Sequence, residues 1–210
     1  MSHPGGATGI LGGTFDPVHL GHVEVARQVR EDLGLARVLL VPSSSPPHRE
    51  APSASPEDRL EMARLAIAGH PGLEVDDVEV RRGGTSYAVD TLHQLKQVEP
   101  GRELVLLLGR DAAVEFGSWH RAAEIGDLAR VAVFNRAGSD GGPIDVEAAG
   151  LPAATILLEV DSPAISATEI RDLLALGGDV SGMVPASVLE YIRDHALYRS
   201  RVGGPRDALS

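Results

Sequence analysis

The sequence predicts an α/β fold in which a doubly wound, mostly parallel sheet carries helices on both faces. Short apolar runs alternate along the chain with longer segments of helical periodicity. Several runs are continuously apolar, as is typical of parallel strands that are buried on both sides. Glycine, proline and serine follow several of the runs and mark turns at their ends. In such a fold, ligands bind outside the carboxyl ends of the strands.

The first strand and helix are expected near the N-terminus. Thr8–Leu11 is a short apolar run closed by Gly12 and Gly13, which indicates a buried strand that ends at a tight turn. A helix follows, because the apolar residues between Leu20 and Val29 can form one face. Gly34 stands where this helix would stop.

The next unit begins with Val38–Val41, a parallel strand that feeds a long Ser/Pro-rich loop. Ser55 supplies a capping hydroxyl, and a proline and two acids follow it, so a helix should run from there to about Ala68. Leu73–Val80 alternates in hydropathy and predicts a strand.

The second half of the chain continues the alternation. Residues 137–152 contain glycine and proline and are expected to form a surface excursion. The remaining expected elements are a helix over Tyr87–Val98, strands at Leu104–Leu108, Val131–Phe134 and Thr155–Val160, and helices starting at Ser166 and Pro185.

The composition fits a folded chain with an acidic surface. Of 210 residues, 43% are hydrophobic and 23% are charged, which allows a sizeable core. Nineteen lysines and arginines against thirty acidic residues give a formal net charge of −11, which disfavours a long nucleic-acid partner. The absence of cysteine excludes disulfides, thiol nucleophiles and zinc-thiolate sites.

We expect a cytoplasmic location and no membrane partner. The N-terminus has no basic segment followed by an apolar one, and no apolar run approaches the roughly 20 residues of a membrane helix. Because no repeat or linker divides the sequence, we expect one domain over residues 1–210. Its core should span about residues 8–200, with mobile tails at 1–7 and 202–210.

The densest group of chemically informative residues follows the first predicted strand and spans residues 12–22, GGTFDPVHLGH. Its glycines let backbone amides approach an anion closely. His19 and His22 are three residues apart, so in a first helical turn both face one side, near the positive end of the helix dipole. This favours phosphate chemistry. The alternatives are a plain strand–turn–helix connection with surface histidines, or a metal site built on the pair.

A second segment, Ile165 to Arg171, opens a predicted helix. Ser166 and Glu169 have the spacing of a capping box, which would explain the segment as a plain helix start. Helix-start amides, two hydroxyls and Arg171 about one turn later are equally suited to a triphosphate, so both interpretations stay open. The chain has no G-x-x-x-x-G-K-[ST] loop, and its first glycines do not fit G-x-G-x-x-G. A P-loop hydrolase and an ordinary dinucleotide oxidoreductase are therefore disfavoured.

Together the two segments resemble the HxGH nucleotidylyltransferases and, among them, the bacterial nicotinate-nucleotide adenylyltransferases. His19 to His22 fit the HxGH signature, and Ile165 to Arg171 resemble the ISxTxxR segment of that family. The resemblance covers about residues 9–198 and implies a Rossmann-like nucleotidylyltransferase fold. Further similar segments follow in the family's order: Pro46 to Arg49, Thr85 to Tyr87, Asp90 to Leu92, Gly109 to Asp111, Trp119, and Asn135 with Arg136.

The resemblance implies direct adenylyl transfer. The 5′-phosphate of nicotinate mononucleotide would attack the α-phosphorus of ATP, releasing pyrophosphate and forming deamido-NAD without an enzyme nucleophile. Such a displacement between two anions requires positioning and charge stabilisation. Mg²⁺ is expected with the triphosphate, held by its oxygens and water, so no metal-ligating residue is expected in the protein.

The resemblance also implies roles for single residues. His19, His22 and Arg171 are the expected catalytic residues. The expected ATP-binding residues are Gly12, Gly13, Thr14, Phe15, Asp111, Ser166 and Thr168. The expected nicotinate mononucleotide-binding residues are Arg49, Thr85, Ser86, Trp119 as a ring-stacking partner, and Arg136.

The sequence departs from the family pattern at four positions without losing an expected catalytic group. Arg49 stands where lysine is common, Ala167 where serine is frequent, Ala137 where proline is usual and Arg110 where a small residue is usual. Two alternative functions remain. One is the same chemistry on another acceptor, such as nicotinamide mononucleotide or phosphopantetheine, and the other is a non-catalytic nucleotide-binding module. The oligomeric state stays open.

Overall fold

The computed structural model describes residues 6–46, 51–136 and 144–199. Within them the chain forms a six-stranded sheet in the order β3-β2-β1-β4-β5-β6, and every pair of neighbouring strands is parallel. The strand order reverses direction at β1, which is the switch point of a doubly wound sheet. The strands are β1 (Thr8–Gly13), β2 (Arg37–Pro42), β3 (Leu73–Val75), β4 (Leu104–Gly109), β5 (Arg130–Arg136) and β6 (Ile156–Val160).

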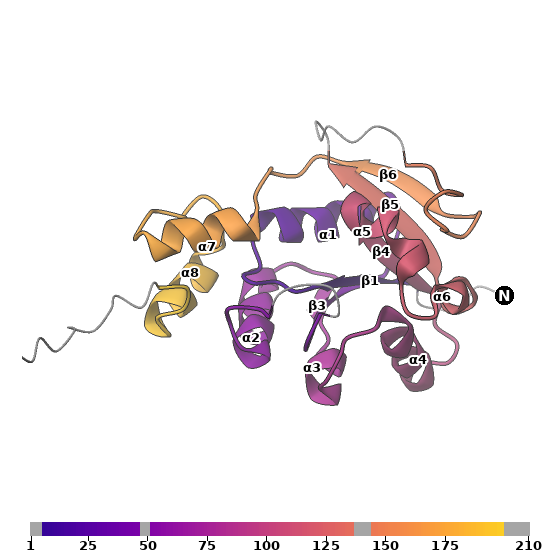
Figure 1. Cartoon of the computed structure of the whole chain (residues 1–210), viewed down its shortest axis with the longest axis horizontal. Coiled ribbons are helices and arrows are strands. Elements are labelled where there is room, and N and C mark those ends of the chain that lie inside the picture. The colour runs from indigo at the N-terminus through magenta and orange to yellow at the C-terminus, as the bar shows by residue number, and fades with distance from the viewer. Residues whose placement is uncertain (1–5, 47–50, 137–143, 200–210) are drawn as a thin grey trace, which may run out of the picture.

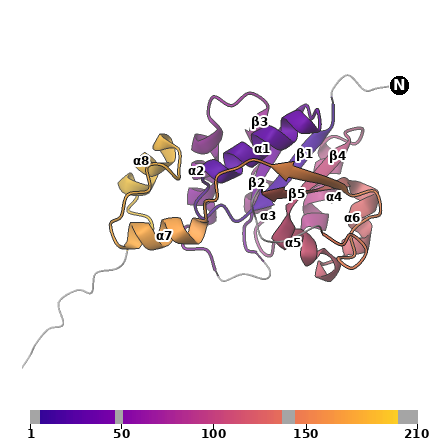
Figure 2. The same ribbon diagram turned by 90° about the horizontal axis from the view of Figure 1, so that it is seen from above.

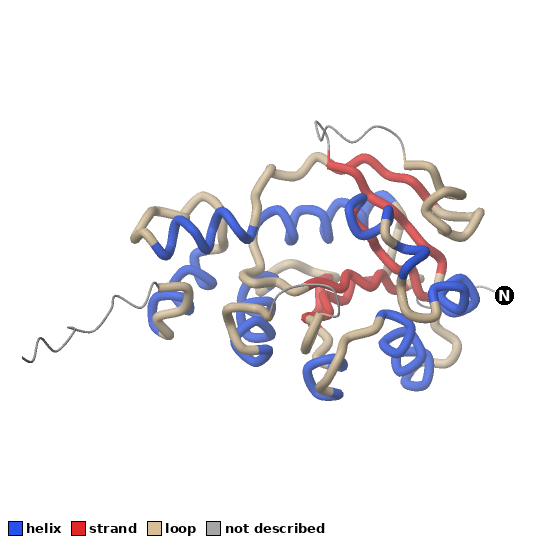
Figure 3. The backbone as a smooth tube through the Cα atoms, viewed as in Figure 1, coloured by secondary structure: helices blue, strands red, loops and turns tan. Residues whose placement is uncertain are grey.

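Helices lie in the connections from β1 through to β5 and cover both sides of the sheet, as Figures 1 and 3 show. The predicted fold class is therefore confirmed. The helices of the described residues are α1 (Leu20–Asp32), α2 (Pro56–Ile67), α3 (Val78–Arg82), α4 (Ala88–Val98), α5 (Arg110–Val114), the 3₁₀ turn η1 (Phe116–Ser118), α6 (Ala122–Leu128), α7 (Ala167–Ala175) and α8 (Ala186–Asp194).

Two hydrophobic clusters fill the space between the sheet and its two helical layers. Neighbouring residues of a strand point to opposite faces, so Leu11 belongs to one cluster and Ile10 to the other. The first cluster packs α1 and α2 against the sheet and continues into α7 and α8, where α8 packs on α2. The second packs α4, α5 and α6 against the other face of the sheet. Because both faces of the sheet are covered, consecutive residues of β1, β2 and β4 are buried, which explains why these strands appear in the sequence as continuous apolar runs.

Most of the predicted elements are confirmed within one or two residues. Ser55 caps α2 as predicted, because its side chain accepts a hydrogen bond from the Asp58 amide. Gly34 follows α1 in a left-handed conformation, with φ of 60°, which glycine adopts without the steric cost of a side chain. The helices predicted to begin at Ser166 and Pro185 start one residue later, with those two residues as N-caps.

The prediction of a strand over Leu73–Val80 is wrong beyond Val75. The Asp76 amide still donates to the Leu40 carbonyl beside the strand. Its side chain, however, accepts a hydrogen bond from the Val78 amide at 2.8 Å, and helix α3 begins there. A short acidic side chain that binds the backbone two residues on favours a turn over a strand.

The expected surface excursion at residues 137–152 is partly corrected. Residues 137–143 lie outside the described residues. In the remainder, Ala149 and Leu151 are buried in the second cluster. The Gly117 amide donates to the Ala149 carbonyl at 3.0 Å, so this segment packs against η1 instead of projecting into solvent.

Helices α1 and α7 begin side by side at one edge of the molecule. Figures 1 and 2 agree in placing the start of α7 next to the start of α1, with α7 and α8 extending away from the N-terminus. The Leu20 amide, at the start of α1, donates to the Met183 carbonyl between α7 and α8 at 2.9 Å. This arrangement brings together the two segments that the sequence analysis singled out.

Most of the expected mobile tails, residues 1–5 and 202–210, lies outside the described residues. Ala7 is ordered by pairing, since its carbonyl accepts a hydrogen bond from the Ala36 amide at 2.9 Å. None of the helices in the described part of the chain is both long and apolar enough to cross a membrane.

Candidate active site

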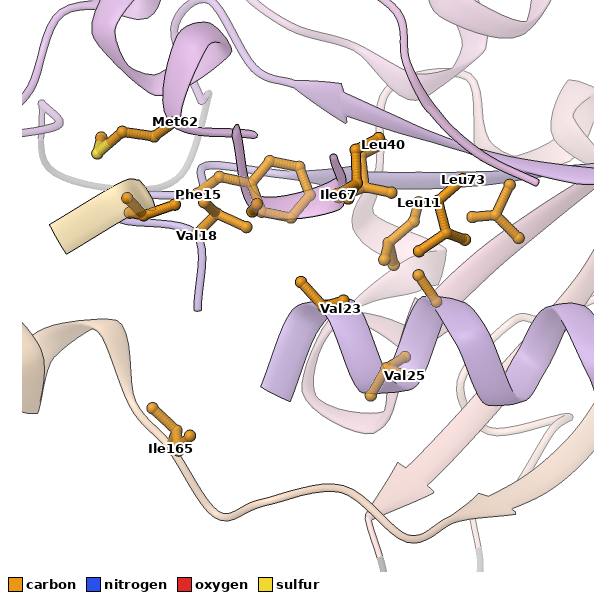
Figure 4. Close-up of a cluster of buried hydrophobic side chains, with 14 of the residues drawn as sticks. Leu11, Phe15, Val18, Val23, Val25, Leu40, Met62, Ile67, Leu73 and Ile165 are labelled. Atoms are coloured by element: carbon orange, nitrogen blue, oxygen red, sulfur yellow. The ribbon is translucent and has the colours of Figure 1, made fainter. Parts of the chain in front are cut away.

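The site begins in the loop that follows β1. Phe15 is buried in a left-handed conformation with φ of 52°, which is rare for a bulky residue and is maintained by the packing around it. Figure 4 shows Phe15 and Val18 together beside Met62 of α2. A Cβ at Gly13 would lie 2.9 Å from the Phe15 ring, whereas a Cβ at Gly12 would meet nothing within 4 Å. The backbone at Gly12 is therefore open to a ligand.

The two histidines of the loop form a stacked pair at the start of α1. Their ring centroids lie 3.6 Å apart, with 26° between the planes, and the Phe15 ring meets His22 edge-on at 5.0 Å. His19 is the N-cap and His22 the third helical residue, as the spacing predicted. His19 is only 2% exposed, so the surface-histidine alternative is wrong for it.

A hydrogen bond orients the His22 ring. The His19 backbone amide donates to Nδ1 of His22 at 3.2 Å. Because Nδ1 accepts, the proton of the neutral ring lies on Nε2, which can donate to an oxygen. Phosphate oxygens at a helix N-terminus are acceptors of this kind.

Gly21, between the histidines, lies in a closely packed position. An added Cβ would lie 3.1 Å from Nδ1 of His19 and 3.2 Å from the Pro163 carbonyl oxygen. Pro163 belongs to the segment between β6 and α7. Glycine at position 21 therefore lets the start of α1 approach the segment that leads into α7.

Arg171 joins the two motifs into one site. Its Nη1 donates to the Asp16 carbonyl oxygen at 2.8 Å, across 155 positions of sequence. Its Nη2 donates to the Thr168 hydroxyl at 3.2 Å. A guanidinium therefore lies beside the histidine loop, where it can meet the oxygens of a bound polyphosphate.

Ser166 is the N-cap of α7, but its side chain makes no capping hydrogen bond. The capping-box interpretation of Ser166 and Glu169 is therefore wrong for the side chains. Ser166 and Thr168 are both exposed. Their hydroxyls lie at the start of a nine-residue helix, in the same turns as Arg171.

Arg59 of α2 supports the loop from beneath and was not anticipated from the sequence. It is fully buried, and its guanidinium donates to the carbonyls of Thr14 at 2.7 Å, Ser44 at 3.1 Å and Ala54 at 3.3 Å. Burial lowers the pKa of Arg59, and the negative charge of Asp16 opposes this shift. The sequence held one signal, because position 59 shares the apolar face of the helix with Met62, Ala63 and Ala66.

The expected acceptor segment, Thr85 and Ser86, lies beside the end of β2. Thr85 forms an isolated parallel bridge with Ser45, and the Ser44 amide donates to the Ser86 hydroxyl at 2.9 Å. The Ser86 amide donates to the Ser45 carbonyl at 2.9 Å, so it is already engaged and is not a free donor for a substrate carboxylate. The Ser44 carbonyl also accepts a hydrogen bond from Arg59, which donates to Thr14 as well. One buried guanidinium therefore links the histidine loop to the acceptor segment.

Glu79 of α3 supports Ser86 from the interior. It is 6% exposed and accepts a hydrogen bond from the Thr91 hydroxyl at 2.6 Å. Burial raises the pKa of Glu79, while hydrogen bonds from Ser86 and Thr91 and the charge of Arg82 act in the opposite direction.

The remaining predicted residues lie on neighbouring loops or outside the described residues. Trp119 is half-buried after η1, with its ring 5.6 Å from Phe116, and Asp111 is exposed in the first turn of α5. Gly109 is the N-cap of α5, so Asp111 is not the capping residue of this helix. Arg49 and the Arg136 side chain fall outside the described part.

Metal ligands do not gather at this site or elsewhere in the described residues. No three histidine, cysteine, aspartate or glutamate side chains there form a group that could hold a metal ion. The metal-site interpretation of His19 and His22 therefore lacks a third ligand.

Comparison with known proteins identifies the family. The cytidylyltransferase-like family model matches residues 10–173. A probable nicotinate-nucleotide adenylyltransferase of Pseudomonas fluorescens is 42% identical, with 91% of this chain and 97% of that protein covered. One of the same name from Marinobacter nauticus is 44% identical, with coverage of 91% and 96%.

The chain belongs to the nicotinate-nucleotide adenylyltransferase family. A solved member of that activity class, the nicotinic acid mononucleotide adenylyltransferase of Plasmodium falciparum in complex with NaAD, shares the fold with a TM-score of 0.76. It is 18% identical to this chain, and the alignment covers 92% of this chain and 97% of the other.

Three residues in or beside the histidine loop had no role expected from the sequence: Asp16, Arg59 and Tyr198. Asp16 stood inside the histidine motif but had no expected role, and its partners come from distant segments. Arg59 was detectable as a cation on an apolar helix face. Tyr198, which donates to Asp16 at 2.8 Å, gave no local signal.

Proposed function

We propose that this chain transfers the adenylyl group of ATP to nicotinate mononucleotide, forming nicotinate adenine dinucleotide (deamido-NAD) and pyrophosphate. The family membership supports the reaction, and one contact supports its location. That contact is the hydrogen bond from Arg171 to the Asp16 carbonyl, which unites the histidine loop and the start of α7. The named activity of the relatives is the same conversion.

The reaction is a direct displacement at the α-phosphorus. A 5′-phosphate oxygen of nicotinate mononucleotide forms the new bond to phosphorus while the bond to the oxygen bridging the α- and β-phosphorus breaks, and the electron pair leaves with pyrophosphate. Charge rises on the leaving pyrophosphate, and preorganised donors stabilise it. No side chain is required as a nucleophile.

His22 donates from Nε2 to the reacting α-phosphate, and His19 holds the His22 ring in place. Because Nδ1 of His22 accepts from the His19 amide, Nε2 is the nitrogen of the neutral ring that donates. Open backbone at Gly12 and the turn through Thr14 and Phe15 give the triphosphate room beside the start of α1. His19 packs flat on His22 from its buried side and restricts that ring to one orientation.

Arg171, Thr168 and Ser166 receive the departing pyrophosphate. The hydroxyls lie in the first turn of α7 and Arg171 follows one turn later. A planar guanidinium pairs with two phosphate oxygens at once, and the helix start adds its dipole. The hydrogen bond from Arg171 to the Asp16 carbonyl holds this group of residues beside the histidine loop.

On the acceptor side, Trp119 stacks on the nicotinate ring, and Arg49 and Arg136 meet phosphate oxygens. On the ATP side, Asp111 binds a ribose hydroxyl. Thr85 supplies the donor to the nicotinate carboxylate, because the Ser86 amide is engaged with Ser45. Ser86 then acts by holding Thr85 beside Ser45.

Magnesium enters with ATP as part of the substrate complex. The triphosphate oxygens and water would be its ligands, as is common for magnesium bound with a nucleotide. When bound, Mg²⁺ neutralises charge on the phosphates during transfer.

A pyrophosphate-release assay with ATP and Mg²⁺ tests the proposal, with nicotinate and nicotinamide mononucleotides compared in parallel. We expect pyrophosphate and nicotinate adenine dinucleotide in equal amounts, and a higher kcat/KM for the nicotinate form. Faster turnover of the nicotinamide form would reassign the acceptor. No pyrophosphate with either would refute adenylyl transfer to a pyridine mononucleotide.

A further inference from the structure

Asp16 lies three residues before His19, and its side chain accepts hydrogen bonds from three donors. Its Oδ1 accepts from the Tyr198 hydroxyl at 2.8 Å and from the Ala54 amide at 3.1 Å, and its Oδ2 accepts from the Ser53 amide at 2.8 Å. Asp16 is 5% exposed. A buried carboxylate of this kind depends on its hydrogen bonds, since water is not there to replace a lost donor.

The same residue carries the contact that joins the two motifs. The Asp16 carbonyl oxygen accepts from Arg171 Nη1 at 2.8 Å. A change in the Asp16 backbone would therefore move the anchor of Arg171 and, three residues later, the histidine at the N-cap of α1. Asp16 is the point at which both halves of the proposed phosphate site can be disturbed together.

Tyr198 is the donor to Asp16 that comes from furthest along the chain, 182 positions away. It follows α8 and has φ of 61°, a left-handed conformation that non-glycine residues keep only when their surroundings enforce it. Burial raises the pKa of the Tyr198 hydroxyl, and the charge of Asp16 raises it further. The hydroxyl therefore remains a proton donor to Asp16 throughout the pH range of an assay.

We propose that Tyr198 is a positioning residue for adenylyl transfer, whose hydroxyl fixes Asp16 and through it both the histidine pair and Arg171. The inference rests on the proposed function, because Arg171 and the histidines are its phosphate-binding groups. The simpler explanation is that Tyr198 only fastens the segment after α8 to the rest of the molecule. The two explanations differ in what loss of the hydroxyl does to catalysis.

The chain contains a matched control. Tyr191 of α8 also donates its hydroxyl to an aspartate, Asp58 of α2, at 3.0 Å. Burial and the contact with Asp58 raise the pKa of Tyr191 to about 12. Asp58 is at the start of α2 and is not in the histidine loop. Tyr191→Phe thus removes the same kind of bond from the same region without touching Asp16.

The experiment compares Tyr198→Phe and Tyr191→Phe with the wild-type chain in kcat, in both KM values and in Tm. We expect Tyr198→Phe to lower kcat about 10- to 100-fold, because a displacement near 1 Å at reacting groups costs up to about that much. Its KM for nicotinate mononucleotide should stay close to wild type, because the acceptor segment does not touch Asp16. Tyr191→Phe should keep wild-type kcat, even if its Tm falls by as much as that of Tyr198→Phe.

Wild-type kcat in folded Tyr198→Phe would overturn the proposal, and so would an equal loss of kcat in Tyr191→Phe. If Tyr198→Phe does not fold, Asp16→Ala provides the second variant, since it removes the oxygen that accepts from the Tyr198 hydroxyl and keeps the backbone carbonyl that accepts from Arg171. Its kcat should fall as well, and a wild-type value would overturn the proposal.

Equilibrium binding of Mg²⁺-ATP separates this inference from the proposed function. We expect the dissociation constant for Mg²⁺-ATP to rise several-fold in Tyr198→Phe and to remain unchanged in Tyr191→Phe. A wild-type chain that binds ATP but releases no pyrophosphate with either mononucleotide would refute the proposed acceptor chemistry only. Equal ATP binding by all three chains would overturn the role of Tyr198.

Discussion

His22 is the single residue on which the chemistry depends most directly. His22→Ala removes the Nε2 donor and should lower kcat at least about 100-fold, in line with the loss of one preorganised donor at a transition state. Tm should change little, because His22 is only partly buried. Steady-state kinetics and thermal unfolding measure both effects.

His70→Ala is the control for that variant, since His70 is exposed in the turn after α2. It should keep full activity. Near-normal turnover of His22→Ala would contradict the role assigned to its imidazole.

Trp119 tests the acceptor side. Trp119→Ala should raise KM for nicotinate mononucleotide well above any change in KM for ATP, because stacking acts on the pyridine ring alone. Trp119→Phe keeps an aromatic face, so its KM for nicotinate mononucleotide should lie between those of the wild-type chain and Trp119→Ala. Equal increases in both KM values would mean that Trp119 supports the fold around η1 and not the nicotinate ring.

Glu79 predicts a pH dependence of stability. Burial raises its pKa above the ordinary 4.5, so its protonated form favours the folded state. The stability that this preference contributes is complete below 4.5 and is lost as the pH rises through the raised pKa. Glu79→Gln is neutral at every pH, so its Tm relative to wild type should increase as the pH rises above 4.5.

Thermal unfolding between pH 4.5 and 8 measures this difference, with Glu147→Gln on the exposed surface as the control. A Tm difference for Glu79→Gln that is constant with pH would contradict the effect of burial on Glu79.

Residue roles were predictable from the sequence only where the partners are close in the chain. His19 and His22 could be placed on one face because three positions separate them. The side-chain contacts of Asp16 come from residues 53, 54 and 198, and those of Arg59 come from two loops, the one after β1 and the one after β2. Such contacts depend on how the chain folds back, which the local pattern does not carry.

At the scale of elements, Gly21 tests the contact between α1 and the segment that leads into α7. Gly21→Ala places a Cβ 3.1 to 3.2 Å from the His19 ring and the Pro163 carbonyl, and one of them must move. We expect a loss of about 1–3 kcal/mol in the free energy of unfolding, as for other overpacked sites, together with reduced kcat.

Gly182→Ala is the control, because a Cβ there would meet nothing within 4 Å. Equal stability of both variants in denaturant unfolding would show that α1 and the α7 segment are not in tight contact.

The long elements were predictable because their apolar periodicity extends over many residues, as in α1 and α4. Helix α5 has five residues and α6 has seven, too few for a helical period to stand out. The strand expected at Leu73–Val80 failed because alternation was given more weight than the adjacent Asp76 and Asp77. The Asp76 side chain accepts a hydrogen bond from the Val78 amide, and the strand ends there.

For the whole molecule, an acidic chain must bind two anionic substrates. The formal net charge of −11 opposes this, so the site has to gather local positive potential. The start of α1 lies beside the start of α7, and Arg171 lies between the two motifs, with Arg59 buried beneath the loop. This convergence across 155 positions is a property of the fold, which the family resemblance implied and local patterns did not.

The most direct test is a crystal structure with a non-hydrolysable ATP analogue, Mg²⁺ and nicotinate mononucleotide. We expect an α-phosphate oxygen about 3 Å from Nε2 of His22, with the β- and γ-phosphates at Arg171 and Thr168. A triphosphate bound away from both the imidazole pair and Arg171 would contradict it.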